Sequence, residues 1–336
     1  MTAPLAELLE MGRALGGLRW VQGPGGNVSV KTGSELWVKA SGTRLRDVAT
    51  EAGHARVALD VAARALAGDA AADAELFART PRPSLETYFH MLPARVVAHT
   101  HPVGAHLYAC SSAVSPPEIG AKVSEIPYVR PGRGVALAIE AVLDRAAPEQ
   151  VIVLRSHGIV ALAPTAARAI ALTVAFDEAV RAGWPALPDF DQLVLAYSRA
   201  EEASAFDGGV VQPLPPRATN ATSTTPPRYL FPDAPVCAGA VLVDALGDAP
   251  GPLAARALAA TGRAGVLVDA HGRRAAFARN ASQLAQTIEV LAAHDWIEDA
   301  LAARGATRYL ADDEPARILD MPAEQYRIRL AATSTT

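Results

Sequence analysis

Residues 83 to 101 read PSLETYFHMLPARVVAHTH and combine a helix start, an apolar strand and a pair of histidines. Two valines lead directly into the segment that carries His99 and His101. Side chains at positions i and i+2 of a strand lie on one face, so both imidazoles are expected to point the same way. Glu86 lies earlier in the stretch, at the expected start of a helix that packs against this strand.

A second apolar stretch, residues 151–162, reads VIVLRSHGIVAL and carries His157 next to a glycine. His157 is therefore the candidate third nitrogen donor beside His99 and His101. Three imidazoles and the carboxylate of Glu86 form a ligand set that suits Zn2+ and leaves a labile position for substrate. The alternative is that the histidines are core residues whose ring nitrogens are satisfied by hydrogen bonds within the protein. The alternative for Glu86 is a favourable interaction with a helix N-terminus.

A metal held in this way is a Lewis acid that binds a carbonyl or hydroxyl oxygen of a substrate. The metal would stabilise the negative charge of an enolate or enediolate, which forms when the carbon next to that carbonyl loses a proton. Glu86, partly desolvated near the metal, is the expected general base that removes or returns the proton. Hydrolysis is disfavoured, because the chain has no H-E-x-x-H motif. His90 and His106 are expected to be core or helix-face histidines.

Two loops rich in glycine and small polar residues precede this stretch, GGN at residues 25–27 and SGT at residues 41–43. Glycines let backbone N–H groups converge on an anion, and Asn27 and Ser41 add side-chain donors. Ser84 is the expected N-cap of the helix with Glu86, and it could hold an anion there too. The alternative is that both loops are ordinary hairpin turns. Neither has the spacing of a P-loop or a dinucleotide fingerprint.

The composition limits the classes of partner and the compartment. The net charge of -4 gives no reason to expect nucleic acid or an anionic membrane as partner. The two cysteines imply no disulfide framework and favour a reducing compartment. The N-terminus, MTAPLAELLEMGRAL, has no uninterrupted apolar core and is read as neither a secretory signal nor a membrane span. A cytoplasmic protein is expected.

The pattern of apolar residues divides the 336-residue chain into three parts. Residues 1–204 alternate strands and helices on one layered α/β plan and carry the candidate site. Residues 205–228 are rich in proline, threonine and serine and are expected to form a linker. Residues 229–336 are expected to form a small α/β accessory domain without chemistry of its own. In this part Asn280 and Gln283 predict a capping box at the start of a long helix.

Five motifs, GGNVSV, ASGT, PSLETYFH, HTHP and SHGIV, resemble those of the class II aldolase/adducin family in order and approximate spacing. They span about residues 5 to 200. The family includes fuculose and rhamnulose phosphate aldolases and ribulose-phosphate 4-epimerases. The GGN and SGT segments are particularly similar to the aldolase half of rhamnulose-phosphate aldolase/alcohol dehydrogenase fusions. The resemblance implies an α/β domain of three layers, a central sheet flanked by helices, followed here by the small α/β domain.

The resemblance also implies a site. Zn2+, with Mn2+ or Co2+ as alternatives, would be held by His99, His101 and His157, with Glu86 as acid/base and occasional ligand. Members of the family are commonly homotetramers with sites at subunit boundaries. The substrate would be a small anionic molecule, and its phosphate would be bound by Gly26, Asn27, Ser41, Gly42 and Ser84.

The implied function is a zinc-dependent aldolase, a carbon–carbon lyase that cleaves a sugar or sugar phosphate through a metal-stabilised enediolate. A 4-epimerase, a decarboxylase and a non-enzymatic, adducin-like assembly module are the alternatives. Leu85 departs from the family pattern, because phosphate aldolases usually carry a second serine just before the catalytic glutamate. The anion is therefore a phosphate with one donor fewer, or a carboxylate. Tyr128 and Arg130 are the nearest candidates for the family's proton-donating tyrosine.

Overall fold

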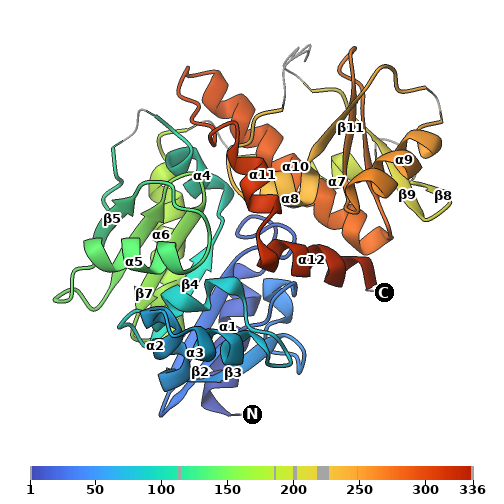
Figure 1. Ribbon diagram of the computed structural model, residues 1–336. Coiled ribbons are helices and arrows are strands. Elements are labelled where there is room, and N and C mark those ends of the chain that lie inside the picture. The colour runs from blue at the N-terminus through green and yellow to red at the C-terminus, as the bar shows by residue number, and fades with distance from the viewer. Residues whose placement is uncertain are drawn as a thin grey trace. The chain divides into compact units, whose positions relative to one another are not determined.

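The computed structural model describes residues 2–112, 115–184, 187–199, 203–217, 227–247 and 249–333. Contacts within the chain divide it into two units, Met1–Ala186 and Leu187–Thr336, each with its own sheet and helices (Figure 1). The expected α/β class, with a central sheet flanked by helices and a smaller second α/β unit, is confirmed. None of the helices in the described residues is long and apolar enough to cross a membrane.

Seven strands form the sheet of the first unit. They are β1 (Asn27–Thr32), β2 (Glu35–Lys39), β3 (His54–Ala58), β4 (Val96–Thr100), β5 (Lys122–Ile126), β6 (Gln150–Leu154) and β7 (Gly158–Ala163). Their order is β3-β2-β1-β4-β7-β6-β5, and all neighbours are antiparallel except β5 and β6. β4, β6 and β7 are buried along their whole length, as expected for valine- and isoleucine-rich strands covered on both faces.

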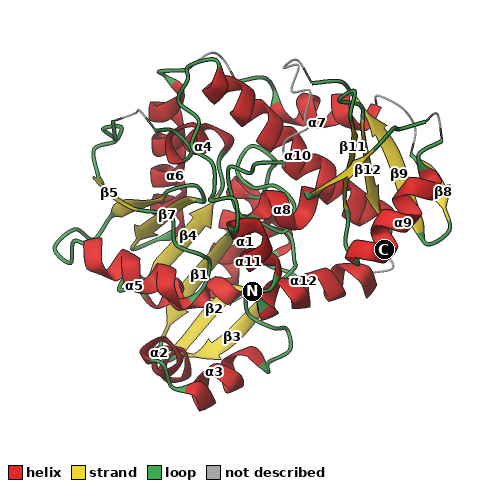
Figure 2. Ribbon diagram, turned by 45° about the horizontal axis from the view of Figure 1, so that its top comes forward, coloured by secondary structure: helices red, strands yellow, loops and turns green. Residues whose placement is uncertain are grey.

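Helices cover both faces of this sheet, which gives three layers (Figure 2). The first layer consists of α1 (Ala3–Leu15), α4 (Val103–Ala109) and α6 (Ala166–Arg181). The second consists of α2 (Leu59–Ala67), α3 (Ala70–Phe77), α5 (Arg133–Val142) and the 3-10 helix η2 (Leu85–Met91). A second 3-10 helix, η1 (Leu45–Asp47), packs against α1. The candidate site therefore receives residues from the sheet, from turns at its strand ends and from η2.

Five strands form the sheet of the second unit, in the order β10-β11-β12-β9-β8. The strands are β8 (Ser204–Phe206), β9 (Gly209–Leu214), β10 (Ala240–Val243), β11 (Gly265–Asp269) and β12 (Arg274–Ala278). The helices are α7 (Phe190–Arg199), α8 (Asp233–Ala238), α9 (Gly251–Thr261), α10 (Ala281–Ala302), α11 (Glu314–Leu319) and α12 (Pro322–Thr333).

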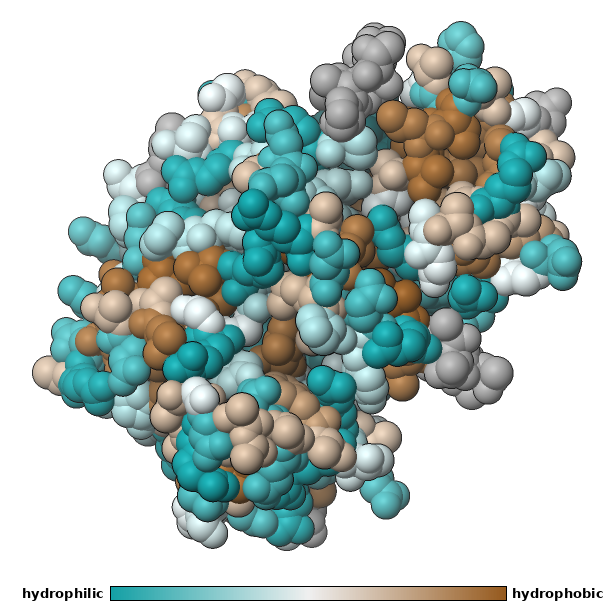
Figure 3. All heavy atoms as spheres, in the orientation of Figure 1, coloured by the Kyte–Doolittle hydropathy of each residue, from teal (hydrophilic) through white to brown (hydrophobic). Residues whose placement is uncertain are grey.

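The second unit has its own hydrophobic core between α9 and the sheet, with Phe277 and Val211 at its centre. β10 is an edge strand, and its Leu242 is half exposed. Hydrophobic residues gather on the surface of this unit in the area where Figure 1 labels β11, as the brown spheres of Figure 3 show.

The expectation of a linker over residues 205–228 is wrong for its first part. Residues 204–214 form β8 and β9, and β9 pairs with β12 so that Val211 lies opposite Phe277. Pro213 is compatible with a strand because β8 pairs only with residues 209–211, so β9 is unpaired on that side at position 213. The contacts also place the division of the chain between Ala186 and Leu187 instead of after residue 204. Residues 218–226 of the expected linker lie outside the described residues.

The start of α10 follows the sequence pattern closely. The side-chain oxygen of Asn280 accepts the backbone N–H of Gln283 at 2.8 Å. The side chain of Gln283 accepts the N–H of Arg279 at 3.0 Å, one residue before the cap that an ideal capping box would use. Two N–H groups at this helix end are therefore satisfied by side chains.

Replacing Asn280 with alanine is expected to destabilise the first turn of α10 by about 1 kcal/mol, because the Gln283 N–H loses its acceptor. Hydrogen exchange at the Gln283 amide should accelerate about fivefold, since 1.4 kcal/mol corresponds to a factor of ten. Asn280→Ser keeps an acceptor and is the control. Unchanged protection in the alanine variant would contradict the assigned cap.

Candidate metal centre

Three histidines meet where β4 ends and where the chain turns from β6 into β7. β4 pairs with β7 so that His99 lies opposite Val160, which puts the end of β4 beside the turn that carries His157. The three imidazoles are buried, and one nitrogen of each lies within 4.8 Å of the others. The Nε2 atoms of His99 and His101 are 2.9 Å apart. The structure thus brings together the three histidines that the sequence singles out.

Glu86 joins this group from the first turn of η2. Its Oε1 lies 3.3 Å from Nε2 of His99 and 3.4 Å from Nε2 of His157. Burial raises the pKa of the Glu86 carboxyl, but the two neighbouring histidines outweigh burial and hold the pKa well below its usual value. The group is therefore an ionised carboxylate at neutral pH, and it lies against two of the three imidazoles.

His99 is held in the tautomer that a metal ligand requires. Its Nδ1 lies 2.9 Å from the carbonyl oxygen of Ile159 on β7. A carbonyl only accepts hydrogen bonds, so Nδ1 carries a hydrogen, and Nε2 is the ring nitrogen that faces His101 and Glu86. Three imidazole nitrogens in this arrangement could hold a divalent cation, with the Glu86 carboxylate beside two of them.

The turn between β6 and β7 is under close steric restraint. A Cβ atom at Gly158 would lie 2.6 Å from the Thr100 carbonyl oxygen and 2.8 Å from Cδ2 of His101, so only glycine fits. Ser156 has φ +54°, a left-handed conformation that costs a residue with a Cβ about 1–3 kcal/mol. Strain of this kind is found where the surroundings impose a functional geometry. Here the strained residue directly precedes His157.

Asn27 lies next to the histidines from the other side. It is opposite His99 in the pairing of β1 with β4, and its side chain is fully buried. Among the described residues, neither its amide nitrogen nor its amide oxygen has a hydrogen-bond partner. A buried amide is rarely left unpaired, so this one indicates a place for a ligand or an ordered water. The preceding Gly26 has φ +68°, and a Cβ there would meet Val21 at 2.5 Å.

The other predicted anion-binding residues lie on the second loop, Ser41 and Gly42, and at the start of η2, Ser84. An isolated antiparallel bridge joins Ala40 to Pro83, so Ser41 lies opposite Arg82, whereas Ser84 lies opposite Lys39. Gly42 has φ +77°, as a tight turn requires. The Oγ of Ser84 accepts the backbone N–H of Glu86 in the first turn of η2, so Ser84 is the N-cap of this helix, as the sequence predicts. The bridge therefore ties this loop to the helix that carries the carboxylate.

Lys39 links the two loops, a role that its sequence position alone does not reveal. Its side chain is buried, and its ammonium group donates to the carbonyl oxygens of Pro24 at 3.1 Å and Thr43 at 2.7 Å. A lysine at the end of an otherwise apolar strand, LWVK, is the signal that could have pointed to it. The GGN and SGT loops are thus fixed relative to one another by one buried cation.

Leu85 lies between Ser84 and Glu86 but faces elsewhere. Its side chain packs against the hydrophobic core of the second helix layer, about 3.9 Å from where a Cβ of Gly132 would be. It therefore offers an apolar contact in place of a hydroxyl donor. Tyr128 and Arg130 lie between β5 and α5, in the same part of the chain as Gly132.

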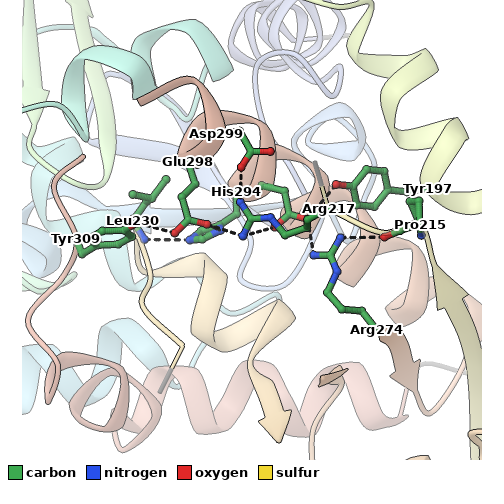
Figure 4. A network of polar contacts seen from close by, with 10 residues as sticks. Tyr197, Pro215, Arg217, Leu230, Arg274, His294, Glu298, Asp299 and Tyr309 are labelled. Atoms are coloured by element: carbon green, nitrogen blue, oxygen red, sulfur yellow. Dashed lines mark hydrogen bonds and ion pairs between the residues drawn. The ribbon is translucent and has the colours of Figure 1, made fainter. Parts of the chain in front are cut away.

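A second group of possible ligands lies on α10 in the other unit, formed by His294, Asp295 and Glu298 (Figure 4). Arg217 pairs with Glu298 at 2.7 Å, and Arg274 pairs with Asp295 at 2.5 Å. The Nε2 of His294 accepts the backbone N–H of Leu230 at 3.2 Å. Guanidinium groups already neutralise these carboxylates, so the group is an ion-pair network and does not suit a metal.

Comparison with known proteins gives one family. The family model described as "Class II Aldolase and Adducin N-terminal domain" matches residues 6–184. A curated relative, the "Uncharacterized oxidoreductase YuxG" of Bacillus subtilis (strain 168), is 27% identical over 215 residues, which cover 57% of this chain and 29% of that protein. The chain therefore spans less than a third of the length of this relative.

Solved structures are similar over about half of the chain. The N-terminal class II aldolase domain of a conserved protein from Thermoplasma acidophilum is 25% identical, covers 55% of this chain and 94% of its own, and has a TM-score of 0.48. The l-fuculose-1-phosphate aldolase from Thermus thermophilus is 20% identical, with coverages of 55% and 98% and a TM-score of 0.38.

Replacing Gly158 with alanine is expected to push the turn away from Thr100 and His101, and with it His157. The affinity for Zn2+ or Co2+ should fall about tenfold or more, the scale seen when a metal ligand loses its support. Gly33→Ala is the matched control, because Gly33 also has positive φ but a Cβ there meets no atom within 4 Å. Titration calorimetry with the metal measures both variants. Equal affinities in the two would contradict the steric account.

Proposed function

The chain belongs to the class II aldolase and adducin N-terminal domain family, and we propose that it is a metal-dependent lyase. Its reaction would break a carbon–carbon bond in a small anionic hydroxy-carbonyl compound, a sugar or sugar phosphate. One observation carries the proposal, namely the convergence of three histidine nitrogens and the Glu86 carboxylate beside the unpaired amide of Asn27. A fold kept only for assembly has no need of such a group of buried polar atoms.

His99, His101 and His157 would hold the metal, with Glu86 as a further ligand in part of the cycle. Zn2+ is favoured because imidazole nitrogen and carboxylate oxygen are its usual ligands, and Mn2+ or Co2+ would accept the same set. The bound cation supplies a Lewis acid that polarises a substrate oxygen and lowers the energy of negative charge developing next to it.

The chain's own residues supply the proton chemistry and the binding. The Glu86 carboxylate is ionised at neutral pH, so its Oε1 would take the proton from substrate and return it. The three histidines beside it are buried, and the Glu86 side chain itself is 14% exposed. The part of the substrate that does not react with Glu86 would be bound by other residues.

The anionic end of the substrate would lie against the two loops. Asn27 offers an unpaired amide, and Ser41 and Ser84 offer hydroxyl groups. Gly26 and Gly42 allow the backbone to approach closely. We further propose a homotetramer, because members of this family commonly assemble in this way. We also propose a cytoplasmic location, because the two cysteines imply no disulfide framework.

Glu86→Gln is expected to lower turnover about 10²- to 10⁴-fold, the range of a lost general base. Metal should remain bound, because the three imidazoles are unchanged. Elemental analysis of the purified variant, together with its rate on the substrate found by screening, measures both effects. Glu35→Gln is the control, since Glu35 pairs with Arg56 at an exposed site. Unchanged turnover in Glu86→Gln would exclude the assigned role.

A screen of metal-loaded protein over free and phosphorylated ketoses and hydroxy-keto acids tests the reaction class. Release of two carbonyl fragments supports the lyase. Inversion at one carbon without release indicates a 4-epimerase, and loss of carbon dioxide indicates a decarboxylase. Absence of stoichiometric divalent metal in the purified protein would favour the assembly module.

A further inference from the structure

We infer that His106 is a positioning residue that holds His157 in place through the backbone carbonyl of His157. The inference rests on the metal site of the proposed function. His106 is fully buried on α4, and its Nε2 lies 3.0 Å from the carbonyl oxygen of His157. Because that oxygen only accepts, the ring nitrogen donates the hydrogen. The ring of His106 also lies 5.8 Å, centre to centre, from the ring of His101.

His157 needs such support more than His99 does. The ring of His99 is oriented by the hydrogen bond from its own Nδ1 to Ile159. Among the described residues, the Nδ1 of His157 has no hydrogen-bond partner. Metal-binding histidines are usually oriented through this second ring nitrogen. The direction of the His157 ring therefore depends on its backbone and on the contact of its Nε2 with Glu86.

That backbone is held in an unfavourable conformation. Ser156 is left-handed at φ +54°, and the next residue, His157, donates its N–H to Leu154 at 3.1 Å. A serine in this conformation tends to relax toward negative φ unless its neighbours prevent it. Relaxation would rotate the peptide that joins Ser156 to His157 and carry the imidazole away from the other ligands.

α4 provides the contacts that prevent this relaxation. The N–H of Ser156 donates to the carbonyl of Ala109 at 2.9 Å, and Arg155 donates to the carbonyl of Tyr108 at 2.9 Å. Both bonds are made by residues that precede His157 in the sequence. The contact from His106 acts on the carbonyl of His157 itself, after the strained residue. It fixes the far side of the turn and so completes the restraint.

Four variants and Co2+ as the probe test this inference in the full chain. His106→Leu removes the donor and keeps the bulk. His106→Gln keeps an N–H at nearly the position of Nε2, whereas His106→Asn carries one too short to reach the carbonyl. Ser156→Gly removes the left-handed strain. Each is measured by Co2+ titration, by the visible spectrum of the bound ion and by thermal unfolding of the metal-free protein.

His106→Leu and His106→Asn should weaken Co2+ binding about tenfold or more and alter the visible spectrum, while His106→Gln retains both properties. In the Ser156→Gly background the loss caused by His106→Leu should shrink to about threefold or less, because no strain remains to be resisted. A merely structural role would lower the unfolding temperature equally in both backgrounds and leave the spectrum of bound Co2+ unchanged.

Equal Co2+ affinity in the original protein, in His106→Leu and in His106→Asn would overturn the role of His106 but would not contradict the metal site. An equal loss in both backgrounds would also overturn it. Failure of the original protein to bind one Co2+ per chain would overturn the metal site and the role of His106 together. Comparing His106→Asn with His106→Gln decides the question even where His106→Leu fails to fold.

Discussion

The antiparallel pairing of β4 with β7 is the interaction on which the rest of the site depends. It sets the end of β4, with His99 and His101, against the turn that carries His157. The approach is so close that position 158 has no room for a Cβ atom. Helices then complete the site from opposite faces of the sheet, since η2 contributes Glu86 and α4 holds the turn. The arrangement is a property of the sheet topology and its two helix layers, and no single loop produces it.

The same region concentrates features that oppose folding. Asn27 is buried, and its two amide atoms have no hydrogen-bond partner in the part of the chain that the structure describes. Ser156 is left-handed. Each feature costs the folded state about 1–3 kcal/mol. The long buried strands around them provide the apolar burial that offsets these costs. Rules of local structure are commonly broken at functional sites, and here both exceptions lie within the candidate metal centre or directly beside it.

Local patterns predicted a large part of this structure. The strand that carries His99 and ends just before His101 follows from the β-branched run of Val96 and Val97. The cap of α10 follows from Asn280 and Gln283. Apart from the meeting of His157 with His99 and His101, contacts between distant segments could not be predicted from the sequence, because they depend on how layers pack. The bond from His106 to His157 joins α4 to a turn beyond two further strands, and Lys39 connects two loops through carbonyl oxygens that every residue has. The strand β9 lies in residues 205–228, a proline-rich stretch that predicts a linker, although Pro213 lies where β8 no longer pairs with β9.

The central claim is that three imidazoles bind one divalent metal at the end of β4. X-ray absorption at the metal edge of the zinc-loaded protein tests it most directly. The account predicts nitrogen or oxygen neighbours at about 2.0–2.1 Å and the outer-shell scattering of three imidazole rings. The scattering of one ring should be lost in each of His99→Ala, His101→Ala and His157→Ala when metal is retained. Scattering from fewer than three rings in the unaltered protein, or a spectrum unchanged in all three variants, would contradict the account.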